Sequence, residues 1–160
     1  MSIQVGDQIP DVTLSTMTAD GPQDVTTSDI FAGKKVVLFA LPGAFTPTCS
    51  AAHVPGFVFN HDEIKAKGVD TIACLSVNDA FVMGAWGDAQ NAEGKVMMLA
   101  DGSATFTGAV GLELDLTEKN FGVRSQRYAM IVDDGKVTHL NVEEGGAFEV
   151  SSAEAILKLL

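Results

Sequence analysis

The two cysteines are the side chains of this sequence best suited to covalent chemistry, and their surroundings differ. Cys49 ends a stretch that leaves an apolar run, turns at Pro-Gly and enters a helical pattern: Leu41-Pro42-Gly43-Ala44-Phe45-Thr46-Pro47-Thr48-Cys49. Cys74 lies inside the apolar run 71–77, where alternation leaves it no access to solvent. We therefore expect Cys74 to be a buried structural residue and Cys49 to be the reactive thiol.

The order of residues before Cys49 predicts how its sulfur would be activated. If Thr46 is the N-cap of a helix, Pro47 occupies N1, where its missing N–H is harmless, and Cys49 occupies N3. Unpaired N–H groups and the positive end of the helix dipole then favour a thiolate over a thiol. The alternative is that Cys49 is a small apolar residue at a helix start.

His53 is the other candidate for chemistry in this segment, because it lies one helical turn after Cys49. A Cys/His hydrolytic dyad is conceivable, but Pro55-Gly56 disturbs the helix just beyond, so a hydrogen-bonded structural histidine is favoured. The three histidines are scattered and no CxxC occurs, so the sequence contains no tetrahedral metal signature. We expect no metal and no cofactor.

The elements that must position these residues alternate between short apolar runs and helical patterns. Central strands are predicted at 35–40, 71–77, 96–99 and 128–132, and Asp133-Asp134-Gly135 predicts an antiparallel hairpin to 136–142. Helices are predicted at about 48–67, at 79–91 with Asp79 as N-cap, and at 151–160 with a capping box at Ser151. The pattern indicates an α/β three-layer sandwich with a mixed central sheet flanked by helices.

Length and composition predict a single domain over residues 1–160, since no repeat, linker or low-complexity tract interrupts the chain. The formal net charge of −11 would repel nucleic acid and anionic membranes, so neither is expected as a partner. Two cysteines are too few for a disulfide framework and suit a reducing compartment. With no signal peptide recognised at the N-terminus, a cytoplasmic location is expected.

The segment Pro42-x-x-x-Thr46-x-x-Cys49 resembles the PxxxTxxC signature of the peroxiredoxins, and the similarity extends over essentially the whole chain. The segment from Phe45 to Phe57 and the N-terminal residues Val5-Gly6-Asp7 resemble the corresponding sequences of the type II, or type-five, branch. The resemblance implies a thioredoxin-like fold and a thiol-dependent peroxidase. Hydrogen peroxide and organic hydroperoxides would be its substrates.

The resemblance also assigns roles to four residues. Cys49 would be the peroxidatic nucleophile, Arg127 would stabilise its thiolate and align the peroxide, Thr46 would hydrogen-bond the substrate oxygen, and Pro42 would shield the sulfur from water. Preorganised donors and a permanent cation suit the negative charge that develops when an O–O bond breaks. Arg124 is either a second positive charge at the site or a partner in a rim salt bridge.

No resolving cysteine is evident, because the C-terminal segment reads Phe148-Glu149-Val150-Ser151-Ser152 where two-cysteine members of the branch have one. The expected cycle uses one cysteine and an external thiol. The resemblance implies that this thiol comes from glutathione with glutaredoxin or from thioredoxin. It also implies a homodimer through the Phe45 turn and part of the apolar face of 79–91, including Phe81 and Trp86. The tract 143–146 is interpreted as a solvated loop.

Two other functions remain open from the sequence. One is a thiol–disulfide oxidoreductase, against which the absence of CxxC argues. The other is a non-catalytic thioredoxin-like module, acting as a redox sensor or a chaperone. An intact set of Pro42, Thr46, Cys49 and Arg127 makes the peroxidase the favoured reading.

Overall fold

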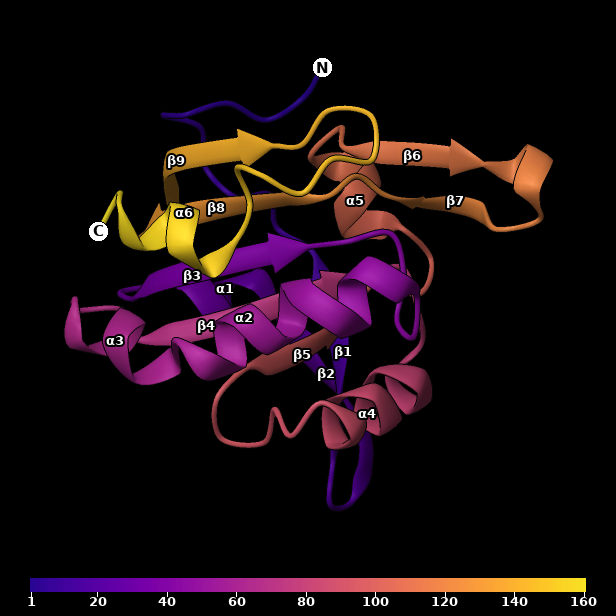
Figure 1. The fold of residues 1–160 in the computed structure, drawn as a ribbon, viewed down its shortest axis with the longest axis horizontal. Coiled ribbons are helices and arrows are strands. Elements are labelled where there is room, and N and C mark those ends of the chain that lie inside the picture. Colours follow the sequence, from indigo (N-terminus) through magenta and orange to yellow (C-terminus); the bar gives the residue numbers. More distant parts are fainter.

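The computed structural model describes residues 1–160 and contains one large mixed sheet (Figure 1). Its seven strands lie in the order β2-β1-β5-β4-β3-β8-β9. The strand bounds are β1 Thr13–Thr18, β2 Gly21–Thr26, β3 Lys35–Ala40, β4 Thr71–Ser76, β5 Met97–Ala100, β8 Tyr128–Asp133 and β9 Lys136–Val142. The strands β3, β4 and β5 run parallel, while β8 pairs antiparallel with both β3 and β9. The mixed sheet and the hairpin after residue 132 are therefore confirmed.

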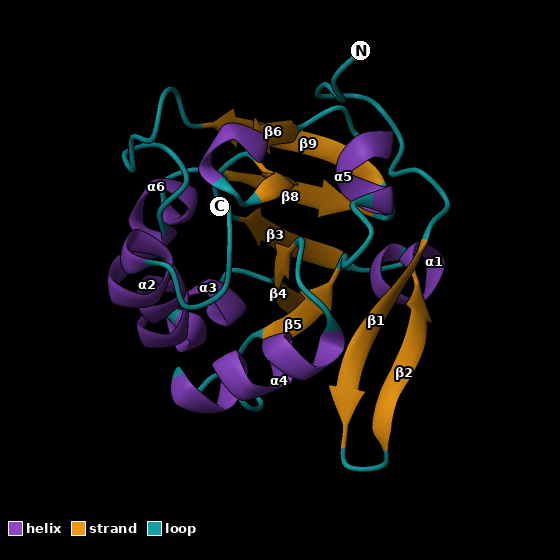
Figure 2. Ribbon diagram, turned by 90° about the vertical axis from the view of Figure 1, so that its right-hand side faces the viewer, coloured by secondary structure: helices purple, strands orange, loops and turns teal.

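Helices cover both faces of this sheet, which gives three layers (Figure 2). One face carries α2 (Val54–Phe59), α3 (His61–Ala66), α4 (Ala80–Ala89) and α6 (Ala153–Leu157), and the other carries α1 (Thr27–Phe31) and α5 (Thr105–Ala109). A separate hairpin of β6 (Glu113–Leu116) and β7 (Gly122–Ser125) projects beyond the large sheet, with the 3₁₀ turn Thr117–Lys119 at its tip (Figure 1). The thioredoxin-like fold class is confirmed.

The central strands are buried on both sides because their apolar side chains alternate between two hydrophobic layers. Phe39 and Cys74 face the layer under α2, α4 and α6, whereas Leu38 and Leu75 face the layer under α1 and α5. Cys49 belongs to the first of these layers. Cys74 pairs with Phe39 in the sheet, and its thiol therefore lies in the interior, beneath the helical segment that carries Cys49.

The predicted helices exist, with corrected bounds. The segment 48–67 is interrupted at Asn60, which ends α2 and precedes α3, and α4 begins after Asp79, whose carboxylate accepts a hydrogen bond from the Val82 N–H. The N-cap of α6 is Ser152 and not Ser151, because the Ser152 hydroxyl accepts from the Ala155 N–H. No helix is long and apolar enough to span a membrane.

Candidate active site

Cys49 lies where the helical segment after β3 begins. The helix starts at Pro47, so Thr46 is its N-cap and Cys49 its third residue, as the sequence predicts. From Cys49 to His53 the backbone forms a π-helical turn, in which the Val54 N–H donates to the Cys49 carbonyl. Pro55 lacks an N–H and its ring would collide with the carbonyl four residues earlier, which disfavours a regular α-helical turn here.

Thr46 occupies the N-cap position but does not use its side chain as a cap. The Thr46 hydroxyl donates to the Gly43 carbonyl at 2.7 Å, while the Thr46 carbonyl accepts the first helical hydrogen bond from the Ser50 N–H at 3.0 Å. Thr46 is therefore the N-cap by position, and its hydroxyl is not the cap. Because its proton is engaged, the hydroxyl oxygen keeps lone pairs that can accept a hydrogen bond from a peroxide O–H.

Arg127 lies just before β8 and joins the sulfur to His53. Its Nη2 donates to Cys49 Sγ at 3.2 Å, and its Nη1 donates to His53 Nδ1 at 2.8 Å. The guanidinium stands 5.8 Å from the ring centre of Phe148. Two of the residues that the sequence singles out, 78 positions apart, are thereby in direct contact.

The His53 ring is neutral, and both of its nitrogens form hydrogen bonds. Since arginine can only donate, His53 Nδ1 accepts, and His53 Nε2 then donates to the Ser151 carbonyl at 2.9 Å. Burial and, after it, the charge of Arg127 lower the pKa of His53 to about 3, although the Ser151 carbonyl and the charge of Glu143 favour the protonated ring. With both ring nitrogens occupied, His53 is a hydrogen-bonded structural histidine and is not placed to act as the base of a hydrolytic dyad.

The low pKa of His53 predicts an acid-sensitive stability. An unfolded chain takes up the His53 proton as the pH falls through 6.5, but the folded chain resists until about 3, so the free energy of unfolding falls by about 1.4 kcal/mol per pH unit between these values. Between pH 6 and pH 4, the free energy of unfolding measured in urea should therefore fall by about 3 kcal/mol more in wild type than in the His53→Gln variant. Equal losses in the two proteins would contradict this assignment, and His61→Gln, at the surface of α3, is the control.

Arg124 supports the loops around the site and forms no salt bridge, so the rim ion pair considered from the sequence is absent. Its Nε donates to the Phe121 carbonyl at 2.9 Å, and its Nη1 lies 3.5 Å from the carbonyls of both Pro42 and Val77. A Cβ at Gly43 would come within 3.0 Å of Arg124 Nη1. Pro42 therefore belongs to the turn that Arg124 braces, at the end of β3 nearest Cys49.

Glu143 is a site residue that the sequence interpretation missed. It is only 7 % exposed, and its carboxylate binds the backbone of the loop that precedes α6. The interpretation of 143–146 as a solvated loop is thus wrong for Glu143. It is followed by Glu144, Gly145 and Gly146, and no motif distinguishes an acid that binds backbone N–H groups from one that faces water.

Cys74 and Trp86 are both fully buried, at 0 % exposure. Burial raises the pKa of the Cys74 thiol well above its ordinary value, in agreement with the structural role expected for it. The Trp86 indole N–H donates to Ser50 Oγ at 3.0 Å, next to Cys49. The expectation that Trp86 contributes to an interface is wrong, because α4 turns Ala80, Met83, Trp86 and Gly87 inward and leaves Phe81 exposed.

The arrangement around Cys49 suits attack by a sulfur nucleophile. No group of three or more His, Cys, Asp or Glu side chains is placed to hold a metal ion. A thiol, a permanent cation and a hydroxyl acceptor converge at one helix start.

Comparison with known proteins gives consistent matches over almost the entire chain. The redoxin family matches residues 4–157. Peroxiredoxin-2D of Arabidopsis thaliana is 55 % identical, with 99 % of this chain and 98 % of that protein covered. The structure of reduced Prx3 from Vibrio vulnificus, in complex with H₂O₂, has a TM-score of 0.95 and 59 % identity, with 98 % of each chain covered.

Proposed function

This chain belongs to the redoxin family as a peroxiredoxin and is a thiol-dependent peroxidase, and we propose that Cys49 is its peroxidatic nucleophile in a one-cysteine cycle. The observation that carries the proposal is the contact of Arg127 Nη2 with Cys49 Sγ, because it gives this thiol, and not Cys74, a permanent cationic partner. Four residues would then act together: Cys49, Arg127, Thr46 and Pro42.

In the first half of the cycle, the Cys49 thiolate attacks one oxygen of the peroxide. The S–O bond forms as the O–O bond breaks, and the attacked oxygen keeps its hydrogen, so Cys49 becomes a sulfenic acid. The leaving oxygen takes a proton from solvent water and departs as water or an alcohol. Arg127 stabilises the charge that develops on the leaving oxygen, and the Thr46 hydroxyl orients the peroxide by accepting a hydrogen bond from its O–H. Pro42, in the turn above the helix start, limits the access of water.

In the second half, a thiol from outside the chain attacks the sulfur of the sulfenic acid and releases water. The resulting mixed disulfide is then cleaved by a second thiol, which regenerates the Cys49 thiolate. Two observations support an external source: Cys74 lies inside β4 between two paired strands, and the C-terminal segment carries Ser151 and Ser152. Because Cys49 has no exposed surface, the helix start must open before a bulky thiol can reach the sulfur.

The reductant is tested by steady-state turnover of hydrogen peroxide with two systems in parallel, glutathione with glutaredoxin and thioredoxin with its reductase. At least one should support turnover of wild type, and Cys74→Ser should turn over at a rate within about twofold of it. Loss of turnover in a folded Cys74→Ser variant would contradict the one-cysteine cycle.

The same proposal includes a homodimer. Phe45 and Phe81 are large aromatic side chains with 57 % and 68 % of their surface exposed, and Phe45 lies beside Trp86 of the helix that carries Phe81. Aromatic side chains exposed together near a site are typical of a surface that a second copy covers. Sedimentation equilibrium should give twice the chain mass for wild type and a monomer for Phe81→Asp, with Phe59→Asp, a similarly exposed residue on α2, as control.

A further inference from the structure

One carboxylate oxygen organises the loop between β9 and α6. Glu143 Oε2 accepts hydrogen bonds from three consecutive N–H groups, those of Glu149, Val150 and Ser151, at 2.8, 2.9 and 2.8 Å. It also accepts from the Ser151 hydroxyl at 2.7 Å. Burial alone would raise the pKa of Glu143, but these hydrogen bonds outweigh burial and hold the pKa below its usual value. The loop is therefore shaped around a negative charge.

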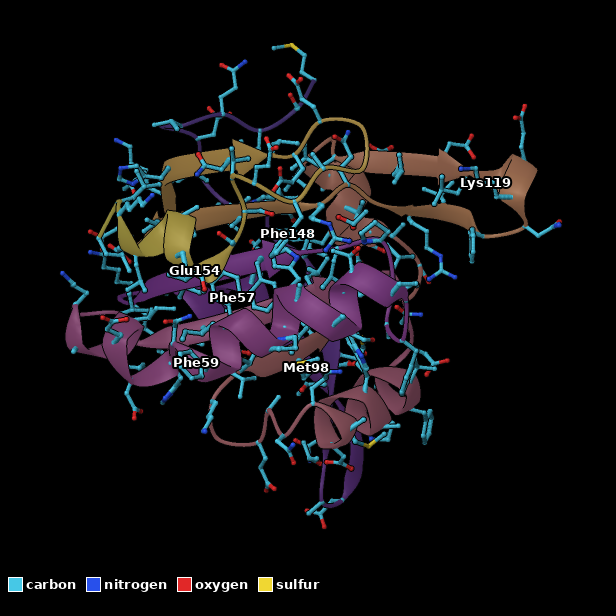
Figure 3. All side chains as sticks on the ribbon, viewed as in Figure 1. Phe57, Phe59, Met98, Lys119, Phe148 and Glu154 are labelled. Atoms are coloured by element: carbon cyan, nitrogen blue, oxygen red, sulfur yellow. The ribbon has the colours of Figure 1, made fainter.

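This loop also forms one wall of the active site. The Ser151 carbonyl accepts from His53 Nε2 at 2.9 Å, and the Phe148 ring packs edge-on against the His53 ring with 5.0 Å between centroids. Phe148 reaches from the C-terminal loop toward the helical segment that carries Cys49 (Figure 3). A shift of residues 148–151 would thus move both a hydrogen-bond acceptor and an aromatic cover.

His53 in turn determines how Arg127 meets the sulfur. Arg127 forms no salt bridge, so its guanidinium is oriented by the neutral Nδ1 of His53 and not by a carboxylate. Nδ1 is an acceptor only while the ring proton stays on Nε2, and the Ser151 carbonyl is what keeps it there. The charged or titratable groups nearest to His53 are three: Arg127 and Glu143, which come from other elements, and Cys49, which lies on the same segment as His53.

We propose that Glu143 is a positioning residue for the peroxidase reaction, acting through the Ser151 carbonyl and His53 to hold Arg127 against Cys49 Sγ. The inference rests on the roles proposed above for Cys49 and Arg127. Glu143 touches neither the sulfur nor the peroxide. Its effect is to fix the direction of one guanidinium N–H, and small displacements of such a group reduce rates strongly.

Glu143→Gln tests this, because glutamine keeps the size of the side chain and removes its charge. The second-order rate constant for oxidation of the reduced variant by hydrogen peroxide should fall by about 10-fold or more, and Glu143→Ala should fall further. Glu144→Gln is the matched control, since that exposed neighbour makes no side-chain hydrogen bond and should react at the wild-type rate. Circular dichroism shows whether each variant is folded. If Glu143→Ala does not fold, the rate measured for Glu143→Gln decides the test.

A second readout separates positioning from a general loss of stability. Loss of the Glu143 charge and of the Ser151 hydrogen bond would each lower the pKa of His53. Release of the loop also admits water, which relieves burial, the largest cause of the low pKa, and so raises it. Titration of the His53 ring by NMR should therefore move upward in Glu143→Gln, and the rate should acquire an acid limb toward about pH 6. A folded Glu143→Gln protein with wild-type rate and an unmoved His53 titration would overturn the proposal. If Cys49→Ser retained the activity instead, the proposed nucleophile itself would be wrong.

Discussion

Cys49→Ser should slow the consumption of hydrogen peroxide by at least about 10³-fold, because a neutral hydroxyl cannot replace the thiolate as nucleophile. The substitution exchanges one atom at a fully buried position, so the fold should survive it. Peroxide consumption should be measured directly as well as by the fluorescence of Trp86. The indole N–H donates to Ser50, the residue next to Cys49, and so the fluorescence should report oxidation of this sulfur.

Cys74→Ser is the matched control for this result, since it makes the same atomic change at the other buried thiol. It should react with peroxide at close to the wild-type rate. Identical peroxide reactivity in Cys49→Ser and wild type would exclude Cys49 as the nucleophile. Dimedone trapping after one equivalent of peroxide should label Cys49 and leave Cys74 unlabelled.

Arg127→Gln should lower the rate constant for peroxide by about 10²–10³-fold, the usual cost of removing one donor that stabilises a developing negative charge. Arg127→Lys should recover only part of this loss. Lysine restores a positive charge, but it cannot reproduce the planar fork that meets Cys49 Sγ and His53 Nδ1 at the same time. Single-turnover oxidation measured over a range of peroxide concentrations separates the chemical step from later reduction.

Lys119→Gln controls for the loss of one positive charge from a strongly acidic chain. Lys119 lies at the tip of the β6–β7 hairpin, which projects beyond the large sheet (Figure 3), so the substitution should leave the rate unchanged. An equal fall in Lys119→Gln and Arg127→Gln would show that net charge, and not the contact with Cys49, is responsible. A normal rate in Arg127→Gln would remove the arginine from the mechanism.

Sequence patterns predict best the strands that are buried on both faces. The strands β3, β4 and β8 are apolar on both faces, and this composition identifies them without knowledge of their partners. The strand β2 was missed because it is mostly exposed and carries Gly21, Pro22 and Asp24, which are residue types depleted in strands. The helices α1 and α5 have five residues each, too few for a periodic pattern to be visible.

The residues of the candidate site likewise fall into those that local sequence relates and those that only the fold brings together. Thr46 and Cys49 lie three residues apart, so local helix geometry relates them as soon as the helix start is recognised. Arg127 was inferred by resemblance to a family, because no local rule joins residues 78 positions apart. Glu143 was not recognised, since its partners are backbone N–H groups of a loop whose shape the side chains do not reveal.

The amino-acid sequence by itself thus determined that Cys49 stands at the start of a helix behind a buried strand, with no CxxC partner and no second thiol near the C-terminal segment. These are local properties, dictated by turn residues, helix-start chemistry and composition. Only the tertiary structure decided that the sulfur meets Arg127, that Arg127 rests on a neutral His53, and that Glu143 holds the loop behind both. Each of these contacts depends on where the sheet brings distant segments together and on which polar groups burial leaves to satisfy one another.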